Sequence, residues 1–314
     1  MTSRVVAVTG ATGFLGRHLV RALAQDGWLP RVLVRRDPIH PLWRGIEVEV
    51  VTGDLKTPGA LGRLCDGAEV VIHGAGLIKA ASLAGFNAVN RDGARAAALA
   101  AKAAGARFIL VSSLAAREPQ LSNYAASKRA GEDAVREAAP DALIVRPPAI
   151  YGPGDTETLG FFQLAAKSPV LPVLSPDSRI AMIHVQDAAA KLADFCKNPI
   201  SGLIELSDVR RDGYTWVEIM SAAGVVMGAK PRFVRLPDTA ILAAGALADA
   251  WSSATHTPAV FGFGKARELL HADWTPSSAP MAERVPSVFG LIDGFSNTVD
   301  WYRSEGWLPK NIVA

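Results

Sequence analysis

The opening of the chain constrains the fold more than any other segment. An apolar run at residues 5–8 leads directly into Thr9-Gly10-Ala11-Thr12-Gly13-Phe14-Leu15-Gly16, and residues 14–25 have helical periodicity. A short apolar run followed by such a stretch predicts a buried strand, a turn and a helix. Three glycines with the spacing G-x-x-G-x-x-G therefore stand at a strand–turn–helix junction.

Each glycine of this turn has its own use. Gly10 can adopt the positive φ of a tight turn, Gly13 lets a ligand approach the backbone, and Gly16 allows close helix–strand packing. The N–H groups and the dipole at the start of the helix stabilise an anion. The junction predicts the pyrophosphate-binding turn of a dinucleotide site, and a turn that serves packing alone is the alternative. The predicted contacts of the turn are Gly10, Thr12, Gly13, Phe14 and Leu15.

The first half of the chain alternates short β-branched runs with alanine-rich helical stretches. Strands are expected at 5–8, 31–34, 48–51, 70–72, 108–111 and 143–145, and helices at 14–25, 89–104 and 124–138. Continuous apolar strands that alternate with helices indicate a parallel sheet covered on both faces. The predicted fold class is α/β, a Rossmann-type doubly wound parallel sheet with a smaller C-terminal lobe.

The texture of the sequence changes after Arg146. Prolines become frequent, and helical segments at 185–197, 215–227 and 240–250 alternate with short strands such as 202–206. We expect a nucleotide-binding domain over 1–155, continued by about 180–206. A substrate-binding lobe is then expected from 156–179 and 207–314.

The residues after the second strand indicate the form of the dinucleotide. An acidic residue at this place binds the ribose 2′-hydroxyl of NAD, but here the chain has Arg35 and Arg36. A guanidinium binds a 2′-phosphate bidentately, so NADP(H) is predicted over NAD(H). Asp54, after the third strand, is placed to meet the adenine edge, and a cap on the following helix is its alternative role.

A second constellation carries proton chemistry. Tyr124 and Lys128 lie four residues apart, on one face of a predicted helix, and Ser112 and Ser113 end the strand before it. A phenol titrates near about pH 10, and a nearby ammonium lowers that pKa. A serine hydroxyl can hold a carbonyl oxygen in line. With a hydride from a bound nicotinamide, these groups supply what carbonyl reduction requires.

Ordered motifs over residues 9–187 now point to a family. They include the opening turn, Gly53-Asp54-Leu55, His73-Gly74-Ala75-Gly76, Val111-Ser112-Ser113, Tyr124 to Lys128, and Arg146-Pro147 through Gly154. The chain resembles an extended or atypical short-chain dehydrogenase/reductase of the NAD(P)-dependent epimerase/dehydratase family. It is similar to members of the 3β-hydroxysteroid dehydrogenase and complex I 39-kDa-subunit types.

The resemblance implies roles for individual residues. Tyr124 would be the acid/base, and Lys128 would also hold the nicotinamide ribose. Ser113 would orient the carbonyl, with Ser112 as the alternative, and Asn90 would be a structural or relay residue. Cofactor contacts beyond the turn would be Arg35, Arg36, Asp54, Leu55, Ala75, Gly76, Ser112, Tyr124, Lys128 and Pro147.

Composition and the remaining motifs exclude other classes. The net charge is +3 without a dense Lys/Arg block, so no nucleic-acid partner is expected. Cys65 and Cys196 stand far apart, which predicts no disulfide framework and a reducing, cytoplasmic location. No Cys/His pair has the spacing of metal ligands, so no metal site is expected. No signal peptide or transmembrane segment is expected, since a spanning helix takes roughly 20 apolar residues. His73, His184 and Asp187 are expected to serve packing and hydrogen bonding.

The substrate is expected to be a small molecule with a bulky hydrophobic ketone or alcohol, such as a 3-oxo sphingoid/ceramide-type lipid or a sterol. Residues 240–251 are expected to form a core helix, with peripheral membrane contact as the alternative. A nucleotide-sugar epimerase or dehydratase and a non-catalytic NADPH-binding assembly subunit are the alternative functions. The helices at 89–104 and 124–138 are candidates for a homodimer interface. The substrate prediction rests on apolar residues of the expected binding region: Leu77, Ile78, Phe161, Phe162, Leu164, Val170, Leu171, Val173 and Leu174.

Overall fold

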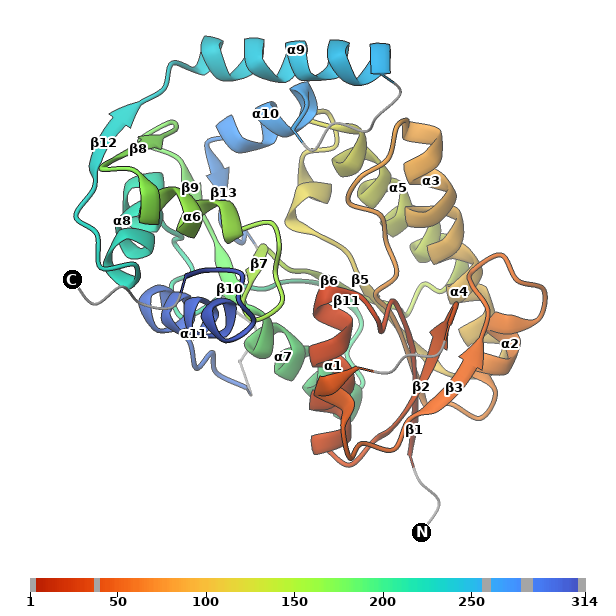
Figure 1. Cartoon of the computed structure of the whole chain (residues 1–314). Coiled ribbons are helices and arrows are strands. Elements are labelled where there is room, and N and C mark those ends of the chain that lie inside the picture. The colour runs from red at the N-terminus through yellow and green to blue at the C-terminus, as the bar shows by residue number, and fades with distance from the viewer. Residues whose placement is uncertain (1–3, 37–39, 256–260, 278–284, 310–314) are drawn as a thin grey trace. The chain divides into compact units, whose positions relative to one another are not determined.

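A seven-stranded parallel sheet organises the first part of the chain (Figure 1). The computed structural model describes residues 4–36, 40–255, 261–277 and 285–309. Within these ranges the chain forms two compact units. Of the described residues, those of 4–147 and 188–206, with residue 285, form the first unit, and those of 148–187, 207–277 and 286–309 form the second.

The strand order of the sheet is β11-β6-β5-β4-β1-β2-β3. The order reverses between β1 and β4, and the crevice beyond the carboxyl ends at such a switch point is where open α/β sheets bind ligands. All pairings are parallel, as predicted. The strands are β1 (Val5–Thr9), β2 (Leu29–Val34), β3 (Glu49–Thr52), β4 (Val70–His73), β5 (Arg107–Val111), β6 (Leu143–Arg146) and β11 (Gly202–Glu205).

Helices cover both faces of this sheet, which confirms the predicted fold class. The side chains of α2 (Ala60–Cys65), α4 (Asp92–Ala103) and α5 (Asn123–Ala138) form one apolar core with β1, β4 and β5. Helix α1 (Phe14–Gln25) and most of α7 (Val185–Lys197) belong to the opposite face (Figure 1). The single helix predicted for 89–104 is wrong in one respect, because α3 (Leu83–Asn90) ends before α4 begins, with Arg91 between them.

The second unit contains short paired strands among helices. The parallel pairs are β7–β10, β8–β12 and β9–β13. The strands are β7 (Ala149–Tyr151), β8 (Val170–Val173), β9 (Arg179–Ile180), β10 (Met182–His184), β12 (Arg232–Arg235) and β13 (Asp273–Trp274). The helices are α6 (Leu159–Lys167), α8 (Trp216–Val226), α9 (Asp238–Thr255), α10 (Phe263–Leu270) and α11 (Leu291–Ser304).

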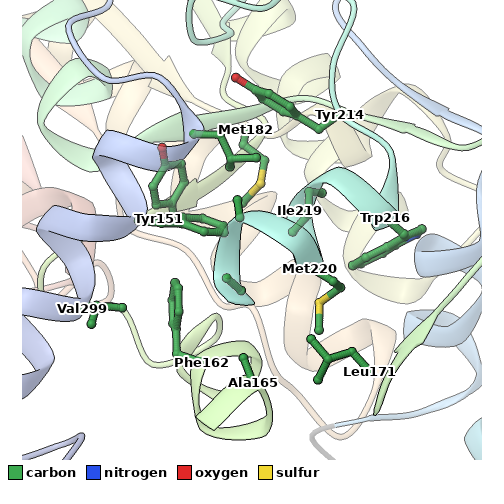
Figure 2. Packing of buried hydrophobic residues seen from close by; sticks show 14 of the residues in the cluster. Tyr151, Phe162, Ala165, Leu171, Met182, Tyr214, Trp216, Ile219, Met220 and Val299 are labelled. Carbon is green, nitrogen blue, oxygen red and sulfur yellow. The ribbon is translucent and has the colours of Figure 1, made fainter. Parts of the chain in front are cut away.

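The core of the second unit corrects part of the substrate prediction. Phe162, Leu171 and Val173 were expected to line a binding region, but they are buried in this core. Figure 2 shows Phe162 and Leu171 among its side chains. They pack there among side chains from α8 and α11, including Ile219 and Val299. A unit without a large sheet needs its aromatic and aliphatic residues for its own core, so these side chains serve stability.

Helix α9 also differs from the prediction of a core helix. It packs against α10. A Cβ at Gly245 on α9 would lie 2.9 Å from the Cα of Phe263 on α10. Leu247 and Trp251 of α9 are 72% and 71% exposed. Large apolar side chains exposed to this degree on one helix leave an apolar surface open to contact. None of the helices in the described ranges has the length and apolar character needed to cross a bilayer.

Candidate active site

The glycine turn after β1 has the shape that an anion-binding turn requires. Gly10 adopts φ +74°, and a Cβ there would lie 2.5 Å from Ala75 N, in the loop after β4. A Cβ at Gly16 would lie 2.1 Å from Gly10 O, so α1 approaches the turn without a side chain between them. Gly13 precedes α1, and neither a side-chain cap nor an acidic residue occupies the start of this described helix. Its first N–H groups therefore suit a pyrophosphate.

A buried hydrogen-bond pair ties β1 to β4 beneath this turn. Thr9 Oγ1 lies 2.9 Å from His73 Nδ1 and accepts the Ala75 N–H at 3.3 Å. Gly74 N donates to Thr9 O at 3.1 Å. Burial and, to a smaller extent, the nearby Lys128 ammonium lower the pKa of His73 to about 3, so the imidazole is neutral near pH 7. His73 is an architectural residue, as predicted.

The residues predicted for the adenosine end lie at the exposed ends of β2 and β3. Arg35 and Arg36 follow β2 and are exposed. Asp54 Oδ1 accepts hydrogen bonds from Thr57 Oγ1 and from the Lys56 N–H, both at 2.9 Å. These bonds, with a smaller contribution from Arg35, lower the pKa of the Asp54 carboxyl. The alternative that Asp54 caps the next helix is wrong, because Gly59 stands at the start of α2.

Leu55 supports this end of the site from below. A Cβ at Gly93, in the first turn of α4, would lie 2.6 Å from Leu55 Cδ1. The leucine side chain therefore rests directly on the α4 backbone, and it fixes the loop after β3 against that helix.

Lys128 is held at the carboxyl end of β5. Its Nζ donates to Val111 O at 2.9 Å. Burial lowers the pKa of Lys128 to about 8, while the Glu132 carboxylate acts in the opposite direction. A Cβ at Gly76 would lie 3.8 Å from Lys128 Nζ, so the loop after β4 and helix α5 meet at this ammonium. The structure thus brings together the predicted residues Gly76 and Lys128.

Tyr124 stands one turn before Lys128 on α5. Its ring is partly buried, with its centroid 6.1 Å from that of Phe86 on α3. Ser127 Oγ donates to Tyr124 O at 2.7 Å and accepts the Asn90 amide at 2.9 Å. Asn90 also exchanges two hydrogen bonds with the Leu77 backbone. Asn90 therefore joins α3, α5 and the loop after β4, which agrees with the first of the two roles, structural or relay, predicted for it.

The two serines after β5 have different environments. Ser112 is buried, and its Oγ donates to Glu132 Oε1 at 2.6 Å. Ser113 is partly exposed, and its Oγ accepts the Ala115 N–H at 3.2 Å at the start of a short 3-10 helix, Leu114–Arg117. Pro147 is buried, and its carbonyl accepts the Leu114 N–H at 3.0 Å.

The structure adds a residue that the sequence analysis missed. Glu132 lies on α5, fully buried, and Arg146 Nε and Nη2 bind its two carboxylate oxygens at 2.8 and 2.7 Å. The signal in the sequence was an acidic residue four positions after Lys128, one helical turn further along.

His184 and Asp187 serve packing in the second unit, as predicted. The Asp187 carboxylate accepts the N–H groups of Val288 and Phe289, each at 3.0 Å. The His184 ring is buried, with its centroid 3.9 Å from that of Phe289. Both residues fix the segment that precedes α11. In the described structure Cys65 and Cys196 are buried free thiols, without a disulfide.

Comparison with known proteins identifies the family of this chain. A family model described as NAD(P)H-binding matches residues 10–194. This chain belongs to that NAD(P)H-binding family, and its fold is shared with solved epimerases and dehydratases. It is an oxidoreductase that uses a nicotinamide cofactor.

Individual relatives narrow the comparison. Over 310 residues, 99% of this chain and 98% of the relative, the chain is 81% identical to a ceramide reductase of Caulobacter vibrioides (strain NA1000 / CB15N). It is 30% identical to the mitochondrial NADH dehydrogenase [ubiquinone] 1 alpha subcomplex subunit 9 of Arabidopsis thaliana, over 74% of this chain and 60% of that protein. The dTDP-glucose 4,6-dehydratase DesIV from Streptomyces venezuelae, solved with NAD bound, has a TM-score of 0.72 at 20% identity. That alignment covers 98% of this chain and 99% of DesIV, and it shows the shared fold.

Proposed function

We propose that this chain is an NADP(H)-dependent reductase of the 3-oxo group of a ceramide-type lipid. The observation that carries the proposal is the end-to-end 81% identity to a ceramide reductase, in a chain with Tyr124 and Lys128 on one face of α5. NADPH supplies a hydride to the carbonyl carbon. The carbonyl oxygen takes a proton, and the products are the 3-hydroxy lipid and NADP⁺.

Three side chains carry the proposed proton transfer. The Tyr124 hydroxyl gives its proton to the carbonyl oxygen as negative charge develops there. The Lys128 ammonium, fixed on Val111 O, stabilises the phenolate left behind and binds the cofactor ribose. Ser113 orients the carbonyl oxygen. The hydrogen bond from Ser112 to the buried Glu132 supports Ser113 over Ser112 in this role.

The second unit supplies the substrate-binding lobe in this proposal. Leu247 and Trp251 on α9 present exposed apolar surface, which suits peripheral contact with the lipid phase that holds such a substrate. The alternatives have less support. The likeness to a sugar-nucleotide dehydratase is one of fold at 20% identity, and the NADH dehydrogenase subunit aligns over 60% of its own length.

A direct assay tests the substrate. Purified chain is mixed with NADPH and a 3-oxo-ceramide in detergent micelles, and NADPH absorbance is followed together with mass analysis of the lipid. We expect NADPH loss matched by a gain of two mass units in the lipid. The matched control is the corresponding 3-hydroxy ceramide, which should give no turnover with NADPH. Turnover confined to UDP- or dTDP-sugars would reject the proposal.

The cofactor preference is tested at Arg35 and Arg36. Replacing both by Ser should raise the KM for NADPH by about 10- to 100-fold, because charge-assisted hydrogen bonds to a 2′-phosphate contribute about 1.5–3 kcal/mol. The KM for NADH should stay the same. Arg21→Ser, which removes an exposed arginine from α1, is the control for loss of surface charge. An equal rise in both KM values would contradict the assignment.

A further inference from the structure

A buried ion network begins next to Ser112, one helical turn after Lys128 on α5. At its centre is the Glu132 carboxylate, which Arg146 binds with two parallel hydrogen bonds. Arg146 Nη1 also donates to Glu205 Oε1 at 3.1 Å, and Arg136 Nη2 donates to Glu132 Oε2 at 3.2 Å. Arg146 is 7% exposed and Glu205 is 3% exposed. A paired network of this kind is costly to break, because one partner alone would be a buried, uncompensated charge.

The network is attached to the site through consecutive residues of one strand end. Val111 O accepts the Lys128 ammonium, Ser112 Oγ donates to Glu132, and Ser113 comes next along the chain. Lys128 and Glu132, one turn apart on α5, therefore bind two neighbouring residues at the carboxyl end of β5. This arrangement fixes the position of Ser113 relative to the helix that carries Tyr124.

We propose that Glu132 is a positioning residue of the reductase site: its carboxylate holds the Ser113 strand end against α5 and keeps Lys128 protonated during turnover. This inference rests on the proposed function in one respect: the protonation of Lys128 affects turnover only if Tyr124 and Lys128 carry out the proposed reduction. The hydrogen bonds of Lys128 and Glu132 to the end of β5 are independent of the substrate.

The charges around Lys128 support this role for Glu132. In the described structure, the groups that interact with the ammonium are Glu132 on its own helix, the Val111 carbonyl on β5 and His73 on β4. The buried imidazole is neutral near pH 7, so it adds no positive charge beside Lys128. Burial lowers the pKa of Lys128, and Glu132 is the carboxylate that raises it. Without this carboxylate, Lys128 should lose its proton at a lower pH.

The test compares Glu132→Gln with Glu205→Gln. Both variants remove one carboxylate from Arg146, but Glu132 also binds Ser112 and Arg136, and it is the carboxylate that acts on Lys128. In pH profiles of kcat/KM for NADPH, Glu132→Gln should move the alkaline limb down by roughly one pH unit. Glu205→Gln should keep the wild-type limb, and Glu132→Asp should restore it in large part. Equal limbs in the two Gln variants would overturn the proposal.

A surface variant keeps the test valid if Glu132→Gln does not fold. The Arg136 side chain is 42% exposed, and Arg136→Gln removes a cation from Glu132 while the buried pairs stay intact. Glu132 should then stabilise the Lys128 ammonium more strongly, so the alkaline limb of the kcat/KM profile should move to higher pH at low ionic strength. An unchanged or lowered limb would contradict the proposal.

A substrate-free readout separates this inference from the proposed function. The Lys128 side chain is titrated by ¹³C NMR in wild type, Glu132→Gln and Arg136→Gln, with Lys128→Met to assign the signal. A lower pKa of Lys128 in Glu132→Gln and a higher one in Arg136→Gln support the role proposed for Glu132, even if 3-oxo-ceramide is not the substrate. If the pKa of Lys128 is unchanged in both variants, the role proposed for Glu132 is wrong, even if the protein reduces 3-oxo-ceramide.

Discussion

Replacing Tyr124 by Phe should lower kcat for ketone reduction by about 10²- to 10⁴-fold, the usual contribution of a positioned general acid. The phenylalanine ring keeps the packing against Phe86 on α3, whose centroid is 6.1 Å from that of Tyr124. NADPH affinity should therefore stay at the wild-type value, because only the proton donor is lost. Steady-state kinetics and a fluorescence titration with NADPH measure the two quantities.

Tyr302→Phe is the matched control for this variant. The Tyr302 hydroxyl is buried in the second unit and donates to Asp155 O at 2.7 Å. Its removal should cost folding stability, by about 0.5–1.5 kcal/mol, without loss of proton transfer. Wild-type kcat in Tyr124→Phe would show that the assignment of the acid is wrong.

Replacing Gly10 by Ala should abolish measurable NADPH binding. The new Cβ would lie 2.5 Å from Ala75 N and from Gly74 C, so the turn after β1 or the loop after β4 must move. At φ +74° the side chain also strains the backbone by roughly 1–2 kcal/mol. The melting temperature should fall, and NADPH should no longer raise it. Thermal unfolding with and without NADPH measures both effects.

Gly27→Ala separates the contact from the strain. Gly27 has φ +82°, but nothing lies within 4 Å of a Cβ built there. This variant should show a loss of stability from strain alone, while NADPH still raises its melting temperature. If Gly27→Ala also fails to bind NADPH, or if Gly10→Ala binds normally, the role given to the Gly10 contact is wrong.

Local patterns predicted the strand, turn and helix that open the chain. The glycine turn depends on residues close in sequence, and helix α1 has the predicted bounds of Phe14–Gln25. Tyr124 and Lys128 are likewise related by one helical turn, so their shared face follows from spacing alone.

Interactions between distant residues were beyond such patterns. Ser112 and Ser113 are neighbours at a strand end, and their different environments depend on Glu132, 20 positions from Ser112. Arg146 and Glu205 are 59 positions apart, so nothing local announces their pairing. In the second unit, an apolar residue such as Leu171 has the same sequence signature in a core as in a binding surface. Only the packing distinguishes a core residue from a residue of a binding surface, and in the structure Leu171 lies in the core.

Gly131 limits how this enzyme can be stabilised. Exchanging a mid-helix glycine for alanine ordinarily improves stability by about 1 kcal/mol, and it is a standard step in engineering for heat resistance. In α5, however, a methyl group at this position would lie 2.2 Å from the backbone oxygen of Asn90. The exchange would force apart the two helices that carry Asn90 and Tyr124, so engineers should leave this glycine in place and look for added stability elsewhere.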